Sequence, residues 1–131
     1  VFPSVTDVFV YGTLTDADRA ADLLDDFSYE GNATLDGLQR VDGEYPTLVP
    51  EGSVDGRILR TPDIDRLDAY EGVDRGLYVR VSVPTAGGDA VETYVGDPAK
   101  LGVAVDWPGE GPFADRVGRY VAGSAVRVVR D

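Results

Sequence analysis

The sequence predicts one α+β or closed-barrel domain in which short strands alternate with short helices. Three observations support this fold class. β-branched and aromatic residues gather in short runs, glycine and proline separate those runs, and some segments repeat apolar residues at helical spacing. The chain has 131 residues, of which 43% are apolar, and this is enough to bury a hydrophobic core. No linker divides it, so we expect residues 1–131 to form a single domain.

The first part of the chain predicts a strand followed by a helix. Residues 8–11 read VFVY and are typical of a short buried strand that ends at Gly12. Thr15 is the expected cap of a helix that runs to about residue 24. Strand-like but irregular sequence then fills residues 29–49, because glycine, asparagine and proline interrupt it.

The middle of the chain predicts a further strand and a second helix. Residues 54–60 form the strand, with Gly56 as a bulge or a point of close backbone approach. The helix begins with Thr61 as a capping hydroxyl and Pro62 at the first helical position. It runs to about residue 71, and Gly72 is its expected stop.

The last part of the chain predicts a hairpin, a helix and a final strand. Residues 77–84 alternate in polarity and pair with residues 90–95 across a glycine-rich turn. Apolar residues recur at helical spacing between residues 113 and 121, and residues 125–129 form the last strand. These elements bring the total to five strands or more.

The residues that are missing restrict the possible chemistry. The chain has no cysteine and no histidine. A disulfide, a Cys nucleophile, a Ser-His-Asp triad and a His-ligated metal site are therefore excluded. No phosphate-binding glycine motif occurs. Proton transfer would fall to Asp, Glu, Tyr, the single Lys100 or bound water.

The charge of the chain is strongly acidic. Its 24 acidic residues outnumber 12 basic ones, which gives a net charge of -12. Such a field repels nucleic acid and anionic membranes, so we expect neither as a partner. Abundant carboxylates with a single lysine are typical of a halophilic protein, because high salt screens their self-repulsion. The alternative is an ordinary acidic protein.

No segment indicates membrane insertion or secretion. No apolar run approaches the roughly 18 residues that a membrane span needs. The opening residues, VFPS, lack the basic start and the long apolar stretch of a signal peptide. The expected compartment is therefore the cytoplasm.

Glu71 is the clearest candidate for acid–base chemistry. Ile64 and Leu67 mark the buried stripe of the predicted 61–72 helix, and Glu71 lies in line with them. Burial and the negative C-terminal end of the helix should both raise the pKa of its carboxyl. Such a carboxyl suits an acid–base catalyst near neutral pH. The alternative is that the helix frays and Glu71 points to solvent.

Two neighbouring features have simpler interpretations. Asp68 borders the same helix face, and we expect it to be a solvated flank or the partner of Arg66 or Arg75. Trp107 lies close to Phe113 in a turn-rich part of the chain. We expect it to pack in the core or in a lid, with a stacking surface as the alternative.

A second candidate for the site is the junction at residues 11–14. A strand ends there at a glycine, and a helix follows directly. Glycine lets a ligand approach the backbone closely, and free N–H groups at such a junction can hold a carboxylate or a developing oxyanion. The alternative is an ordinary strand-to-helix turn in which Thr caps the helix.

Five segments together resemble the γ-glutamylcyclotransferase-like family. Residues 9–14, FVYGTL, are similar to its Y-G-S/T-L glycine loop, and residues 67–72, LDAYEG, to its L-D-x-x-E-G segment. The other three resemble its Y-P-x-L, V-x-G-x-I/L and Y-x-R segments and lie at residues 45–48, 54–59 and 77–80. All five keep the family's order.

The resemblance implies a fold, a reaction and a site. The fold is a small mixed β-barrel with short flanking helices and a cavity at its mouth. In the reaction, the α-amine of a γ-glutamyl group attacks its own side-chain carbonyl, giving 5-oxoproline and a free amine without a metal or cofactor. Glu71 matches the family's catalytic residue. The expected substrate-binding residues that share its cavity are Tyr11, Gly12, Thr13, Leu14, Tyr45 and Tyr78.

Two classes of function stay open at this point. The first is a cyclotransferase whose substrate is a small γ-glutamyl amine or peptide, such as γ-glutamylcysteine or a γ-glutamylated polyamine. The second is a non-catalytic metabolite-binding or interaction protein on the same fold. An exposed Glu71 would favour the second class. The sequence does not specify an oligomeric state.

Overall fold

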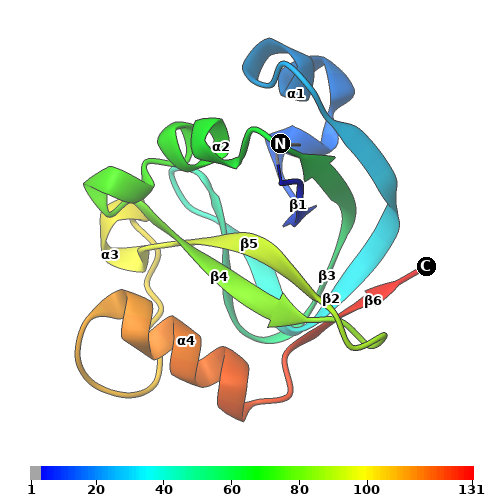
Figure 1. The fold of residues 1–131 in the computed structure, drawn as a ribbon. Coiled ribbons are helices and arrows are strands. Elements are labelled where there is room, and N and C mark those ends of the chain that lie inside the picture. Colours follow the sequence, from blue (N-terminus) through cyan, green and yellow to red (C-terminus); the bar gives the residue numbers. More distant parts are fainter. Residues whose placement is uncertain (1–3) are drawn as a thin grey trace.

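A computed structural model describes residues 4–131, and within them six strands form one curled, mixed sheet (Figure 1). The strand order is β4-β5-β1-β3-β2-β6, and neighbours are antiparallel except for the parallel pair β1 and β5. The expectation that the chain opens without a signal peptide falls mainly on residues 1–3, outside the described part. The strands are β1 (Thr6–Val10), β2 (Ser28–Asp42), β3 (Pro46–Thr61), β4 (Tyr78–Pro84), β5 (Ala90–Gly96) and β6 (Arg127–Arg130).

The hairpin of β2 and β3 is the longest feature of the sheet. The predicted strand at 54–60 is wrong as a separate element, because it is the second half of the continuous β3. Prolines at 46 and 50 are tolerated there because β3 pairs with its second neighbour, β1, only over residues 57–61. Gly37, with φ +101°, lies at a register shift of β2 and accounts for its irregular pattern.

The sheet curls until its two outer strands meet. Thr85, just beyond β4, bridges to Val128 of β6, and the Ala86 N–H donates to the Val128 carbonyl at 2.9 Å. Gly56 is needed inside the curl, since a Cβ there would lie 2.3 Å from the Val10 carbonyl oxygen. The predicted α+β class with a small, mixed, barrel-like sheet is confirmed.

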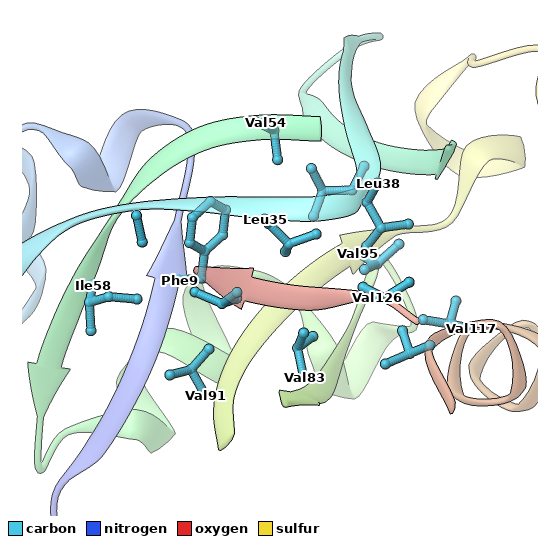
Figure 2. Packing of buried hydrophobic residues seen from close by; sticks show 14 of the residues in the cluster. Phe9, Leu35, Leu38, Val54, Ile58, Val83, Val91, Val95, Val117 and Val126 are labelled. Carbon is cyan, nitrogen blue, oxygen red and sulfur yellow. The ribbon is translucent and has the colours of Figure 1, made fainter. Parts of the chain in front are cut away.

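Apolar side chains fill both faces of the curled sheet. Inside it, Phe9, Leu35 and Val95 pack with residues from every strand, and helix α4 (Phe113–Gly123) adds Val117 and Val121 to the same cluster (Figure 2). Trp107 is only 3% exposed and meets Phe113 edge-on at 5.9 Å between ring centroids. Trp107 is therefore a packing residue rather than an exposed stacking surface.

A second apolar cluster joins the sheet to the helices on its other face. It includes Leu14, Leu24 and Leu67. The short helices of this region are η1 (Thr13–Thr15), α1 (Ala17–Leu23), α2 (Ile64–Tyr70), η2 (Val73–Arg75) and α3 (Pro98–Leu101). None of the helices in residues 4–131 is long and apolar enough to cross a membrane.

Both predicted helix starts need correction. Thr15 does not cap α1, because a turn of 3₁₀ helix intervenes and Asp16 accepts the hydrogen bond from the Asp18 N–H instead. Thr61 is the last residue of β3, so α2 begins later, and Pro62 precedes the helix rather than starting it. The predicted stop at Gly72 is confirmed by its left-handed φ of +69°.

Candidate active site

A cavity of about 410 Å³ opens where the end of β1 faces the end of α2. All seven residues that the sequence places in the site line it, namely Tyr11, Gly12, Thr13, Leu14, Tyr45, Glu71 and Tyr78. The seven lining residues that sequence reasoning missed are Phe9, Val10, Pro46, Tyr70, Arg75, Leu77 and Tyr94. Tyr70 and Arg75 flank the conspicuous Glu71–Gly72 pair in sequence, whereas Tyr94 gives no local signal.

The glycine loop at residues 11–14 is held in place through its carbonyl groups. Arg40 donates to the Tyr11 carbonyl at 2.8 Å, and the Thr15 hydroxyl donates to the Gly12 carbonyl at 2.7 Å. The Tyr29 hydroxyl donates to the Leu14 carbonyl at 2.6 Å. Within the described residues, the N–H groups of 12–14 donate no hydrogen bond. These N–H groups are therefore available to donate hydrogen bonds to a bound oxyanion or carboxylate.

Glu71 lies immediately after α2, at the point where the helix stops. Its own N–H completes the helix by donating to the Leu67 carbonyl at 2.9 Å, and Gly72 then turns the chain away. The Glu71 side chain is partly buried in the cavity wall, and burial raises the pKa of its carboxyl to about 7. The helix end is therefore not frayed, and Glu71 is not fully exposed to solvent.

Three tyrosines, Tyr11, Tyr78 and Tyr94, lie near the Glu71 carboxyl but donate their hydroxyl protons to other groups. Tyr11 donates to the Tyr94 carbonyl at 2.5 Å, and Tyr78 donates to the Pro46 carbonyl at 2.5 Å. Burial raises the pKa of all three phenols. The negative charge of Glu71 adds to this rise, and at Tyr94 the hydrogen-bonded Asp68 adds more to the pKa than Glu71 does. They are thus neutral near pH 7, and the carboxyl stays available to a ligand.

Asp68 has different partners from those predicted. It accepts a hydrogen bond from the Tyr94 hydroxyl at 2.7 Å and lies 3.5 Å from Arg80. Arg66 pairs instead with Asp25, at 2.8 Å. The reason is that β4 and β5 pass beside α2, and helical spacing alone does not reveal those strands.

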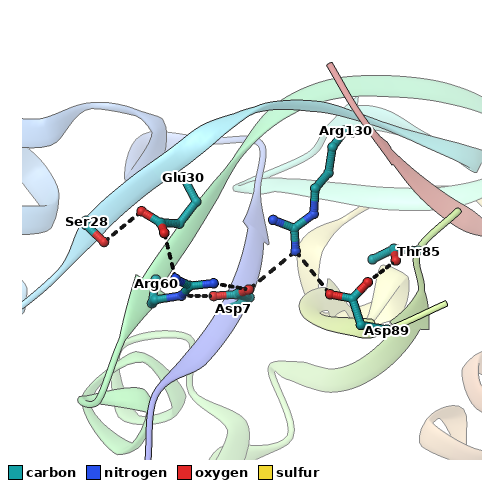
Figure 3. A network of polar contacts seen from close by, with 7 residues as sticks. All are labelled: Asp7, Ser28, Glu30, Arg60, Thr85, Asp89 and Arg130. Carbon is teal, nitrogen blue, oxygen red and sulfur yellow. Dashed lines mark hydrogen bonds and ion pairs between the residues drawn. The ribbon is translucent and has the colours of Figure 1, made fainter. Parts of the chain in front are cut away.

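A second polar cluster lies away from the cavity. Arg60 joins Asp7 and Glu30, each at 2.7 Å, and Arg130 joins Asp7 and Asp89, each at 3.4 Å (Figure 3). None of these residues lines the candidate site. The cluster links β1, β2, β3 and β6 with the turn between β4 and β5. In residues 4–131, no group of three or more Asp or Glu side chains could hold a metal ion.

The fold is that of gamma-glutamyl cyclotransferases. A solved structure named "Gamma-glutamyl cyclotransferase" superposes with a TM-score of 0.63 over 72% of this chain and 68% of that chain, at 18% identity. The structure of an Arabidopsis thaliana protein determined in solution superposes with a TM-score of 0.54, at 32% identity, over 85% of this chain and 79% of that chain.

The sequence comparison identifies the family. This chain belongs to the family described as "Gamma-glutamyl cyclotransferase, AIG2-like", whose model matches residues 8–108. "AIG2-like protein A" of Arabidopsis thaliana is 37% identical over 98 residues, which cover 67% of this chain and 59% of that protein. The chain thus spans about three fifths of the length of the curated relative it matches. The predicted family resemblance is confirmed.

Proposed function

We propose that this protein is a cyclotransferase that converts a γ-glutamyl amine or peptide to 5-oxoproline and a free amine. The observation that carries the proposal is a carboxyl with a pKa raised to about 7, in one cavity with a glycine loop whose N–H groups at residues 12–14 find no acceptor within residues 4–131. Membership in a family described as gamma-glutamyl cyclotransferases supports it. The proposed substrate is a small cytoplasmic molecule, with no nucleic acid or membrane as partner.

In the proposed mechanism, Glu71 moves one proton in each direction. Its carboxylate takes a proton from the α-ammonium of the substrate, and the free amine attacks the side-chain carbonyl carbon of the same glutamyl group. A C–N bond forms and closes the five-membered ring. Holding the substrate folded favours this intramolecular attack, because the two reacting groups already lie close together.

The tetrahedral intermediate then collapses. N–H groups of residues 12–14 stabilise its oxyanion, since they are fixed in place before the reaction begins. Glu71 gives its proton to the departing nitrogen and the second C–N bond breaks. The freed amine then takes the surplus proton from the ring nitrogen, so that 5-oxoproline is left as a neutral lactam and the amine leaves as an ammonium. Glu71 ends as a carboxylate, ready for the next substrate.

The test is incubation with a panel of γ-glutamyl compounds in high salt, with release of 5-oxoproline as the readout. The proposal expects turnover of at least one γ-glutamyl amino acid, peptide or amine. Saturable binding of a γ-glutamyl compound without any 5-oxoproline would contradict the proposal. That result would indicate a metabolite-binding protein that uses the same cavity.

A further inference from the structure

Arg75 is the cationic residue in the wall of the candidate site. It is the last residue of η2, and glycines with left-handed φ values of +69° and +72° stand on either side of that turn. The Arg75 N–H donates to the Gly72 carbonyl at 3.0 Å, and its carbonyl accepts from Lys100 at 3.2 Å. The backbone of Arg75 is therefore fixed at the cavity, although its side chain is exposed.

The guanidinium of Arg75 has no acidic partner within residues 4–131, even though this chain carries 24 carboxylates against 12 cations. Lys100, whose ammonium lies beside the Arg75 and Gly76 carbonyls, has no acidic partner in that range either. Of the ten other arginines, five form ion pairs within the described residues, namely Arg40, Arg60, Arg66, Arg80 and Arg130. In so acidic a protein, an unpaired arginine at a cavity is suited to an anionic ligand.

The guanidinium also has a defined position. A Cβ placed on Gly72 would lie 2.7 Å from its Nη2 atom, so the group rests against the turn that follows Glu71. Burial, and not this neighbouring cation, determines the pKa of Glu71. The Arg75 guanidinium and the Glu71 carboxyl thus both line the cavity, on either side of the turn at Gly72.

The outer part of the cavity is where a leaving group would lie. Tyr45 and Tyr70, which also line it, are 54% and 50% exposed, whereas Glu71 is partly buried and Leu14 is buried. In the proposed reaction the glutamyl amine must reach Glu71. The amine that leaves then extends outward, past the exposed tyrosines and Arg75.

We infer that Arg75 binds a carboxylate on the leaving amine. This inference rests on the proposed cyclotransferase reaction and assigns it a substrate class. The protein selects γ-glutamyl amino acids or peptides with a free carboxylate near the scissile bond. It disfavours γ-glutamyl polyamines, since Arg75 and Lys100 repel a second cation.

The experiment compares three substrates whose leaving groups carry different charges: γ-glutamylalanine, its isosteric carboxamide, and a γ-glutamyl diamine. The wild-type protein should prefer the carboxylate over the carboxamide by roughly ten- to hundredfold in kcat/KM, the scale of one charge-assisted hydrogen bond. Arg75→Gln should bring the two within about threefold, mainly through KM, because Arg75 contributes to binding rather than to proton transfer.

The matched control is Arg66→Gln, which removes an exposed arginine that pairs with Asp25 and does not line the cavity. It should leave the substrate preference unchanged. An Arg75→Gln variant that keeps the carboxylate preference would overturn the inference. So would an equal loss on all three substrates, since that would place Arg75 on the glutamyl carboxylate common to them.

Calorimetric binding separates this inference from the proposed reaction. If none of the three compounds yields 5-oxoproline, the reaction is wrong, but their binding to the wild-type and Arg75→Gln proteins still measures the subsite. A carboxylate preference in binding that Arg75→Gln abolishes supports the subsite. Equal binding of γ-glutamylalanine and its carboxamide to the wild-type protein contradicts it.

Discussion

Glu71 links the proposed chemistry to the stability of the folded protein. Its pKa rises from an ordinary 4.5 to about 7 on folding because the cavity wall removes hydration. Between these values the folded state binds more protons than the unfolded state, so the free energy of unfolding falls as pH rises. The stabilising effect of the protonated carboxyl is complete below about pH 4.5 and is lost as pH passes 7.

Glu71→Gln should therefore stabilise the protein in a pH-dependent way. Gln resembles the protonated carboxyl, so the variant and the wild-type protein should differ little near pH 4.5. Above pH 7 the variant should be more stable by about 2 kcal/mol, somewhat less than the full pKa shift because the carboxyl retains some solvent contact. Urea unfolding at several pH values measures this. A stability difference that does not change with pH would contradict the assignment.

The same substitution should abolish most turnover. Without a proton acceptor, kcat on a confirmed substrate should fall by about a hundredfold or more. In the wild-type protein, kcat/KM should rise with pH around the raised pKa of Glu71, near 7, because the carboxylate is the reactive form. Asp65→Asn is the control, since Asp65 is exposed on the same helix and does not line the cavity. Near-normal activity of Glu71→Gln would rule out the mechanism.

At the scale of elements, the end of α2 determines where the site residues lie. Gly72 stops the helix in a left-handed conformation, φ +69°, and its missing side chain leaves room for Arg75 and Leu77. Gly102 stops α3 with the same φ, but a Cβ there would meet nothing within 4 Å. A substitution at Gly102 therefore measures backbone strain alone, whereas one at Gly72 measures backbone strain together with crowding of neighbouring side chains.

Gly72→Ala should cost more stability than Gly102→Ala. Both substitutions strain a left-handed residue, which costs about 1 kcal/mol. Gly72→Ala must also displace the Arg75 guanidinium and crowd Leu77, where the added Cβ would lie 3.1 Å from that of Leu77. We expect an additional cost of about 1 kcal/mol. Equal values of the free energy of unfolding for the two variants would show that crowding at Gly72 is unimportant.

Local patterns predicted those elements whose signal is complete within a short stretch. The β4–β5 hairpin alternates in polarity across a glycine turn, and α4 repeats its apolar residues at helical spacing, so both were predicted correctly. The prediction divided β3 wrongly because a proline in a sequence indicates a strand break. The prolines of β3 lie where β1 does not pair with it, and the sequence alone does not show this. The four-residue α3 is too short to show a period.

The candidate site shows the same limit. Glu71 and the glycine loop can be found from a helix stripe and a strand end, and the structure brings them to one cavity. Tyr94 and the ion pair of Asp68 with Arg80 depend on which strands pass beside α2. Arg75 is visible in the sequence, but its lack of an acidic partner within the described residues is a property of three-dimensional packing.

At the scale of the whole molecule, the net negative charge is the feature that most affects stability. A net charge of -12 on 131 residues destabilises the compact state through self-repulsion, which salt screens. We expect the Tm to rise steadily between low and multimolar salt, as followed by circular dichroism. A Tm that does not change over this range would show that the acidic composition is not an adaptation to salt.

The meeting of β4 and β6 affects how copies of the molecule behave when they collide. Outer strands with unpaired backbone groups act as templates on which another chain can add a strand, the first step of aggregation. Here β6 has only four residues, and the Val128 carbonyl is already occupied by the Ala86 N–H. Multimolar salt would remove the charge repulsion that keeps molecules apart. The nearly closed sheet then gives a protection against edge-to-edge association that does not depend on charge.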